Sequence, residues 1–333
     1  MADSSMLVPP SPEAGATFAP DFAPRVLLTV DTEEEFDWGA PFLRDGYGLS
    51  HTDQLARFQS FAEGIGAHPV YLVDWPIVQD TRAVATIRDA VGRGTADIGV
   101  QLHPWVNPPF DEKVNARNSY PGNLPPELER AKFLHLHDAI EAAFGTVPLI
   151  YRAGRYGLGD NTSAMLKEAG IRIDSSVRAL FDYREQHGPD FSRHPAFPYW
   201  TGEDRSLLEL PVTSVYSGIF RQLGRAIQRA QRHLPTFFGG MSKMTLLERI
   251  ALTPEGMTIE EALRGIEVAL DDGLPVLVLS FHSPSLAPGH TPYSRTPADV
   301  ERLYDWFKAV YAHLDRRGVR SAKIADILAG VER

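Results

Sequence analysis

Several polar side chains that can carry out acid–base or metal chemistry each end a short apolar segment: Asp31, Asp74, His103, Arg152, Asp174 and His282. Glu209 lies near the end of a further segment of this kind. Short apolar runs without alternating polarity are typical of strands buried on both faces of a parallel sheet. Because active-site groups collect at the carboxyl ends of parallel strands, we expect these side chains to meet at one site.

The first apolar segment runs into an acidic stretch, from Asp31 to Asp37. Asp31 and Glu33, together with His103, supply the oxygen and nitrogen ligands of a divalent ion and leave a coordination position for water. Water on such an ion is a hydroxide-like nucleophile near neutral pH. We interpret the other acidic residues of the stretch, Glu34, Glu35 and Asp37, as solvated neighbours.

The remaining strand-end groups can move protons. Asp31 is the natural acceptor of the proton of the attacking water, and Arg152 would keep it ionised. His282 titrates near neutral pH and can return a proton to a leaving amine or alcohol. Asp174 or Glu209 could hold the His282 ring in place. This set predicts metal-assisted hydrolysis of an amide or an ester.

The elements that must position these groups alternate along the chain. Apolar segments predict strands at 25–31, 69–74, 97–103, 147–152, 170–174, 206–213 and 275–282, and helical patterns lie between them, for example at 52–63, 81–92, 126–144 and 297–317. Successive βα units favour a closed or nearly closed parallel barrel. We expect residues 1–24 to be a poorly ordered leader and residues 218–272 to be a helical insertion, basic between Arg221 and Arg232.

Composition excludes several classes of function. The chain has 33 Lys and Arg against 43 Asp and Glu, a net charge of −10, which argues against nucleic acid and anionic membranes as partners. It contains no cysteine, so disulfides, thiolate zinc sites and cysteine nucleophiles are excluded. No apolar run is long enough to span a bilayer, and the N-terminus carries no export signal. We therefore expect a soluble, cytoplasmic protein.

The same segments resemble, in order, the motifs of the polysaccharide deacetylases, the NodB-homology carbohydrate esterases of family four. The resemblance rests on Leu-Thr-Val-Asp31-Thr-Glu33, Gln101-Leu-His103-Pro-Trp105, Tyr-Arg152-Ala-Gly-Arg155-Tyr-Gly157, Gly-Ile-Arg-Ile-Asp174-Ser-Ser, Leu-Glu209-Leu-Pro211 and Leu-Ser-Phe-His282-Ser. It covers about residues 25–325 and is greatest to the WalW-like branch. It implies a single distorted (β/α)7 barrel and removal of an N- or O-acetyl group from a saccharide.

By this resemblance Asp31 is the catalytic base, Glu33 and His103 are metal ligands, Arg152 positions the base and His282 is the general acid. The expected cofactor is a divalent metal, with Zn²⁺ as the first candidate. The family's second motif normally offers two histidines, and here Gln101 occupies the place of one. Gln101 could ligate weakly, His282 could be recruited, or the site could be metal-free.

Aromatic side chains just beyond the strand ends could stack on sugar rings. We expect Trp38, Trp75, Trp105 and Tyr156, together with Glu209, to contact a saccharide substrate.

Two other functions fit the same residues. A glycoside hydrolase would place Glu33 or Glu35 opposite Asp174 or Glu209. A non-catalytic carbohydrate-binding member of the deacetylase family would keep the aromatic residues and lose the reaction.

Overall fold

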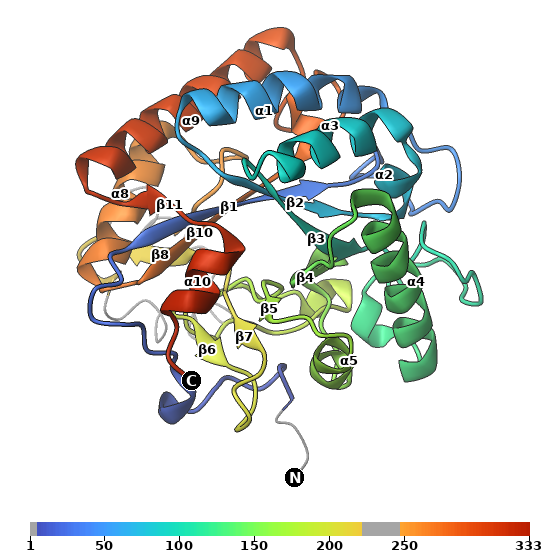
Figure 1. The fold of residues 1–333 in the computed structure, drawn as a ribbon, viewed down its shortest axis with the longest axis horizontal. Helices are drawn as coiled ribbons and strands as arrows, with labels where there is room; N and C mark the ends of the chain where they lie inside the picture. The colour runs from blue at the N-terminus through green and yellow to red at the C-terminus, as the bar shows by residue number, and fades with distance from the viewer. Residues whose placement is uncertain (1–4, 222–246) are drawn as a thin grey trace.

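The computed structural model describes residues 5–221 and 247–333. Within these ranges one curled sheet of nine strands has the order β10-β1-β2-β3-β4-β5-β7-β6, with β11 paired to β1 (Figure 1). The strands are β1 (Arg25–Thr32), β2 (Pro69–Val73), β3 (Asp97–Leu102), β4 (Ile150–Ala153), β5 (Ile173–Asp174), β6 (Tyr199–Trp200), β7 (Leu208–Glu209), β10 (Val276–His282) and β11 (Arg320–Ser321). Only β6 pairs antiparallel, so each predicted strand is present in a parallel sheet.

Helices cover the outer face of this sheet: α1 (Leu55–Gly64), α2 (Trp75–Gln79), α3 (Thr81–Gly92), α4 (Pro126–Phe144), α5 (Thr162–Glu168), α8 (Ile259–Asp271) and α9 (Pro297–Arg316). The last helix, α10 (Ile324–Gly330), packs instead against the inward-facing residues of the sheet. Short 3-10 helices lie at Pro12–Ala14, Ser50–Gln54, Pro121–Asn123, Gly154–Tyr156, Arg184–Gln186 and Ser283–Leu286. In Figure 1, α9, α1 and α3 form an arc outside β10, β1 and β2, and α4 continues it beside β3.

Side-chain alternation along the strands divides the core in two. On β1, Val26, Leu28 and Val30 pack outward against the helices, whereas Leu27 faces the inside of the curled sheet. On β10, Val276 and Val278 face inward in the same way. Every second residue along a strand lies on the same face. Asp31 on β1 and His282 on β10 therefore lie on the inward face and point into the barrel.

Single hydrogen bonds, rather than a continuous ladder, join β10 to Thr213, just after β7, and to Leu252. The Thr213 amide donates to the Val278 carbonyl (3.2 Å), and the Val278 amide donates to the Thr213 hydroxyl (2.8 Å). The Ser280 amide donates to the Leu252 carbonyl (3.2 Å). The predicted distorted, nearly closed βα barrel is thus confirmed.

Two expectations about the rest of the chain are wrong where the structure describes it. Residues 5–24 pack on the barrel: Gly15 forms a bridge with Tyr199, Phe18 forms one with Val331, and Met6 is buried. The expected helical insertion at 218–272 contains, in addition to α8, the strand β9 (Glu248–Ala251), which pairs antiparallel with β8 (Ser214–Ser217) just before the insertion. The basic segment from Arg221 to Arg232 lies, beyond its first residue, outside the described residues. Among the helices described, none is long and apolar enough to cross a membrane.

Candidate active site

A cavity of about 270 Å³ opens at the carboxyl ends of the parallel strands. Its floor gathers most of the residues predicted from the sequence: Asp31, Glu33, Gln101, His103, Arg152 and His282. Strand register brings them together, because Asp31 lies beside His282 in the β1–β10 pair and Gln101 lies beside Arg152 in the β3–β4 pair. The expectation of one site at the strand ends is met by these residues.

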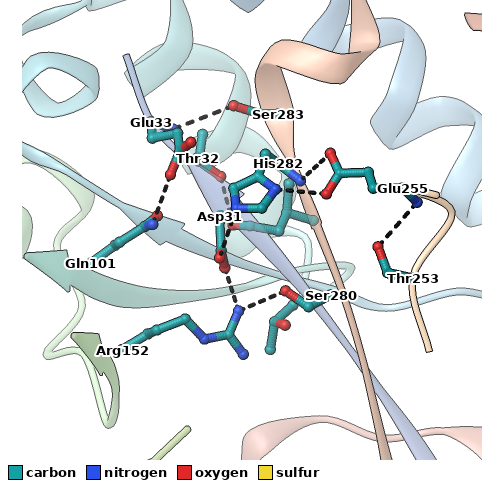
Figure 2. Close-up of polar contacts among 12 residues, drawn as sticks. Asp31, Thr32, Glu33, Gln101, Arg152, Thr253, Glu255, Ser280, His282 and Ser283 are labelled. Atoms are coloured by element: carbon teal, nitrogen blue, oxygen red, sulfur yellow. Dashed lines mark hydrogen bonds and ion pairs between the residues drawn. The ribbon is translucent and has the colours of Figure 1, made fainter. Parts of the chain in front are cut away.

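Asp31 lies between two cationic groups (Figure 2). One oxygen accepts a hydrogen bond from Nη1 of Arg152, and the other is 3.7 Å from Nε2 of His282. The guanidinium is held by further bonds, to the Ser280 hydroxyl (2.8 Å) and, through Nε, to the Ser175 carbonyl (2.8 Å). Arg152 is almost fully buried, so its orientation is fixed by the fold and it in turn orients the Asp31 carboxylate.

Glu255 holds the ring of His282, although no pattern in the sequence pointed to this residue. Its Oε2 is 2.6 Å from Nδ1 of His282, and its Oε1 accepts hydrogen bonds from the His282 amide (3.2 Å) and the Ser285 hydroxyl (2.6 Å) (Figure 2). Burial alone would lower the pKa of His282, but the charges of Glu255, Glu33 and Asp31 raise it to about 10. His282 is therefore protonated at neutral pH and able to donate from Nε2 toward Asp31.

Asp174 and Glu209, expected to hold His282 or contact substrate, do neither. They are fully buried beside each other and do not line the cavity. Burial raises the pKa of both carboxyl groups, and they share a hydrogen bond. Asp174 accepts from the Ser176 hydroxyl (2.6 Å), and that hydroxyl accepts from the Ala153 amide (2.8 Å). The pair thus braces the ends of β4 and β5 behind Arg152.

The predicted metal ligands Glu33 and His103 lie next to each other, with Gln101 between them. Nε2 of His103 is 3.4 Å from Oε2 of Glu33, and the same oxygen accepts from Nε2 of Gln101 (2.8 Å). The other Glu33 oxygen and the Gln101 amide oxygen are buried without any hydrogen-bond partner. Burial raises the pKa of Glu33 to about 8, an effect that the charge of His282 opposes. A cation between these donors would satisfy the unpaired oxygens, so this donor set fits a divalent metal.

Glu34 fixes the tautomer of His103. It is fully buried, accepts from Nε1 of Trp105 (2.6 Å) through one oxygen and lies 2.9 Å from Nδ1 of His103 through the other. With Nδ1–H donating to this carboxylate, Nε2 presents its lone pair to Glu33 and Gln101, as in carboxylate–histidine–metal arrangements. The interpretation of Glu34 as a solvated neighbour is therefore wrong. Glu35 is also paired, through His51 (3.0 Å).

A second group, Glu34, Asp74 and His103, also brings ligand atoms within 4.8 Å of one another. Its oxygens are already used, because the Asp74 oxygens accept from the Glu34 amide (3.0 Å) and the Ile77 amide (3.0 Å). Burial raises the pKa of both carboxyl groups, which are hydrogen-bonded to each other. This group therefore orients His103 from behind, and the unsatisfied donors on the cavity side are the better metal site.

The aromatic residues divide between the cavity and the core. Trp38 and Tyr156 line the cavity, and the Trp38 ring lies edge-on to His282 at 4.8 Å between centroids. Trp105 stacks on His103 (4.2 Å) in the protein interior, and Trp75 packs on His135 (4.6 Å), so neither reaches the cavity. Further aromatic residues from the loops line the cavity and were not predicted from the sequence: Phe36, Phe42, Tyr120, Tyr183 and Tyr293.

No protein-family model matches the sequence, and no curated protein matches it. Among solved structures, a protein from Mycobacterium smegmatis described as a "putative polysaccharide deacetylase" superposes over 97% of this chain and 93% of its own, with 19% identity and a TM-score of 0.51. The chain has the polysaccharide deacetylase fold. The 4-alpha-glucanotransferase from Thermococcus litoralis superposes over 92% of this chain and 40% of its own, with 11% identity and a TM-score of 0.53. At these identities both likenesses concern the fold, and they confirm the barrel that the sequence motifs implied.

Proposed function

We propose that this protein hydrolyses an acetyl ester or N-acetyl group on a saccharide. The observation that carries the proposal is the placement of Asp31 between Arg152 and His282, beside the unpaired oxygens of Glu33 and Gln101. Acyl hydrolysis needs a base for the attacking water and an acid for the leaving group at one carbonyl. These groups meet in one cavity of the deacetylase fold.

Glu33 and Nε2 of His103 would hold the metal, with the amide oxygen of Gln101 as the third protein donor. A divalent metal such as Zn²⁺ supplies an activated water and polarises the acyl carbonyl when it is bound. The Glu34 carboxylate keeps the His103 ring in the tautomer that coordination needs.

Asp31 and His282 divide the proton transfers. Asp31 is held at one oxygen by the Arg152 guanidinium and accepts the proton of the attacking water on the other. His282, charged beside Glu255, donates from Nε2 to the leaving oxygen or nitrogen. Trp38 lies edge-on to the His282 ring, next to the place where the leaving group is protonated.

The geometry does not favour the glycoside hydrolase alternative in the form that the sequence suggested. That reaction needs two carboxyl groups facing each other across an open cleft. Asp174 and Glu209 are hydrogen-bonded to each other outside the cavity, and Glu35 is bound to His51. No described carboxylate of the suggested pair is thus free to face Glu33.

Acetate release tests the proposal. The purified protein, loaded with Zn²⁺, Co²⁺ or Mn²⁺, is assayed on acetylated saccharides and on 4-nitrophenyl acetate. We expect hydrolysis, and we expect Asp31→Asn to lower kcat/KM at least about a hundredfold. Asp37→Asn, on the exposed part of the same acidic stretch, is the matched control and should retain activity. Activity that is absent with every metal and substrate, or that is equal in both variants, would refute the proposal.

Metal content is a second, independent readout. We expect His103→Gln to lower the bound metal measured by elemental analysis, while the exposed His135→Gln leaves it unchanged. Equal metal content in both variants would exclude His103 as a ligand.

A further inference from the structure

The outer wall of the cavity carries a group of arginines around Tyr183. Nη1 of Arg178 donates to the Tyr183 hydroxyl (3.2 Å), and Arg178 and Arg249 both lie over the ring of Phe181, at 4.0 and 3.7 Å from its centroid. Arg155 donates to Gln186 (3.0 Å). Burial raises the pKa of Tyr183, and the charges of Arg178, Arg249 and Arg155 oppose that rise. All three cations therefore lie near the Tyr183 phenol.

Arg155 and Arg178 both line the cavity, and in the described parts of the chain neither has a carboxylate within ion-pair distance. The Nε atom of Arg178 is buried and has no hydrogen-bond partner among residues 5–221 and 247–333. Burial lowers the pKa of Arg155, as expected for a guanidinium removed from water without a counter-ion. Both guanidinium groups have neutral hydrogen-bond partners only, and a partly buried cation without a counter-ion is costly, so these groups are suited to receive an anion.

The carboxylates that line the cavity cannot serve as their partners. Asp31 is bound to Arg152, Glu255 to His282 and Glu33 to Gln101, all on the cavity floor. The reaction groups at the floor are therefore paired with one another, which leaves a separate cationic wall at Arg155 and Arg178.

The backbone at this wall is also strained. Arg155 and Tyr156 are consecutive residues with positive φ, 56° and 61°, a region that side-chain-bearing residues rarely adopt. Both line the cavity. Strain of this kind persists where the surrounding structure holds a side chain in place, and it clusters at ligand sites.

The geometry points to an anionic group on the substrate saccharide, a carboxylate or a phosphate, bound between Arg155 and Arg178 while the acyl group lies at Asp31 and His282. This assignment rests on the proposed function and narrows it to acidic saccharides. Guanidinium groups bind carboxylate and phosphate oxygens through paired hydrogen bonds, and Tyr156 and Tyr183 offer ring faces to the sugar beside them.

Binding to the wild-type protein tests the assignment directly. Isothermal titration calorimetry at low ionic strength compares trigalacturonate with maltotriose, and glucose 1-phosphate with glucose. We expect at least one acidic probe to bind about tenfold more tightly than its neutral counterpart, and the stronger pair identifies carboxylate or phosphate as the preferred group. Equal binding of the acidic and neutral probes in both pairs would overturn the assignment.

Variants test the residues. Arg178→Gln and Arg155→Gln should each reduce the preference for the acidic probe about tenfold, while Arg88→Gln, an exposed residue of α3, should keep it. If both cavity variants keep the preference, the assignment fails. Should one variant not fold, as circular dichroism would show, the other decides.

The proposed function has its own readout. Hydrolysis of uncharged 4-nitrophenyl acetate by the wild-type protein does not depend on the arginine wall. Absence of that hydrolysis together with tight acidic-probe binding would refute the deacetylase activity and leave the anion site standing. Hydrolysis together with equal binding of all probes would refute the anion site and leave the deacetylase activity standing.

Discussion

Replacing Glu255 by Gln removes the charge that the structure places against His282 and keeps the shape of the side chain. In the wild type, Oε2 of Glu255 is 2.6 Å from Nδ1 of His282, while Oε1 accepts the His282 amide and the Ser285 hydroxyl. A glutamine has a single carbonyl oxygen and can accept only some of these hydrogen bonds. It also offers no negative charge to the ring. The variant therefore isolates the electrostatic contribution of Glu255.

The size of the effect follows from the hydrogen bond that is lost. A hydrogen bond to a charged group contributes about 1.5–3 kcal/mol and a neutral one about 1 kcal/mol. The difference corresponds to about one pKa unit or somewhat more. In the wild type, burial lowers the pKa of His282, but the neighbouring charges raise it to about 10. We expect this pKa to fall by about one unit in Glu255→Gln.

The first assay is a titration of the His282 ring by nuclear magnetic resonance in protein freed of divalent metal. The second is the free energy of unfolding in urea as a function of pH. Because the folded pKa of His282 lies above the unfolded value of about 6.5, its stabilising contribution is complete below pH 6.5 and is lost as pH rises toward 10. The loss of stability in Glu255→Gln should therefore be largest near pH 6 and shrink toward pH 10.

The exposed Glu260→Gln on the neighbouring α8 is the control and should change neither quantity. An unchanged pKa of His282 in Glu255→Gln would refute the reasoning. A loss of stability that stays constant from pH 6 to pH 10 would show that Glu255 acts through packing rather than through its charge.

Further predictions concern buried groups. Lys132 donates to the Pro104, Asn107 and Pro109 carbonyls and to Glu112, so Lys132→Met should cost about 3–5 kcal/mol of unfolding free energy, measured in urea. Burial lowers the pKa of His194 to about 4, below its unfolded value of about 6.5. As the pH is lowered from 6.5 to 4, the free energy of unfolding should therefore fall by up to about 3 kcal/mol. His194→Gln should remove this dependence on pH. Trp105→Phe removes the donor to Glu34 and should weaken metal binding about tenfold, measured by competition with a chelator.

Each of these has a matched comparison. The exposed Lys308→Met should be nearly neutral, and equal losses in both lysine variants would contradict the role of Lys132. The exposed His187→Gln should keep the pH slope that His194 produces. The partly exposed Trp38→Phe leaves the Glu34 hydrogen bond in place, so metal affinity reduced equally in both tryptophan variants would exclude an effect through Glu34.

Much of the floor of the site follows from the sequence, because the rule that places it is local. Parallel strands end at one edge, so Asp31, Arg152 and His282 at the ends of apolar segments had to converge. Glu255 could not be found in this way. It lies in the loop between β9 and α8, 27 residues from its partner, and only the folded chain brings that loop over β10.

Alternation along the strands explains the residues that were misplaced. Leu208 and Leu210 face inward around β7, and Ile173 faces inward on β5, so Glu209 and Asp174 point to the opposite face. The alternation of side chains between the two faces of a strand can be read from the sequence. Which of the two faces is the inner one is decided only by the folded barrel. Trp75 and Trp105 lie beyond the strand ends, where no repeating pattern sets the direction of a side chain.

The sequence by itself determined the parallel βα barrel and the strand-end groups at its mouth, because short apolar segments and the residues that end them are local properties of the chain. The tertiary structure decided which of those groups share the cavity, that Glu34 and Glu255 orient the two histidines, and that Arg155 and Arg178 lack carboxylate partners. Those facts depend on distances between segments that are remote in the chain, and burial and pairing fix the charges only after the segments have met.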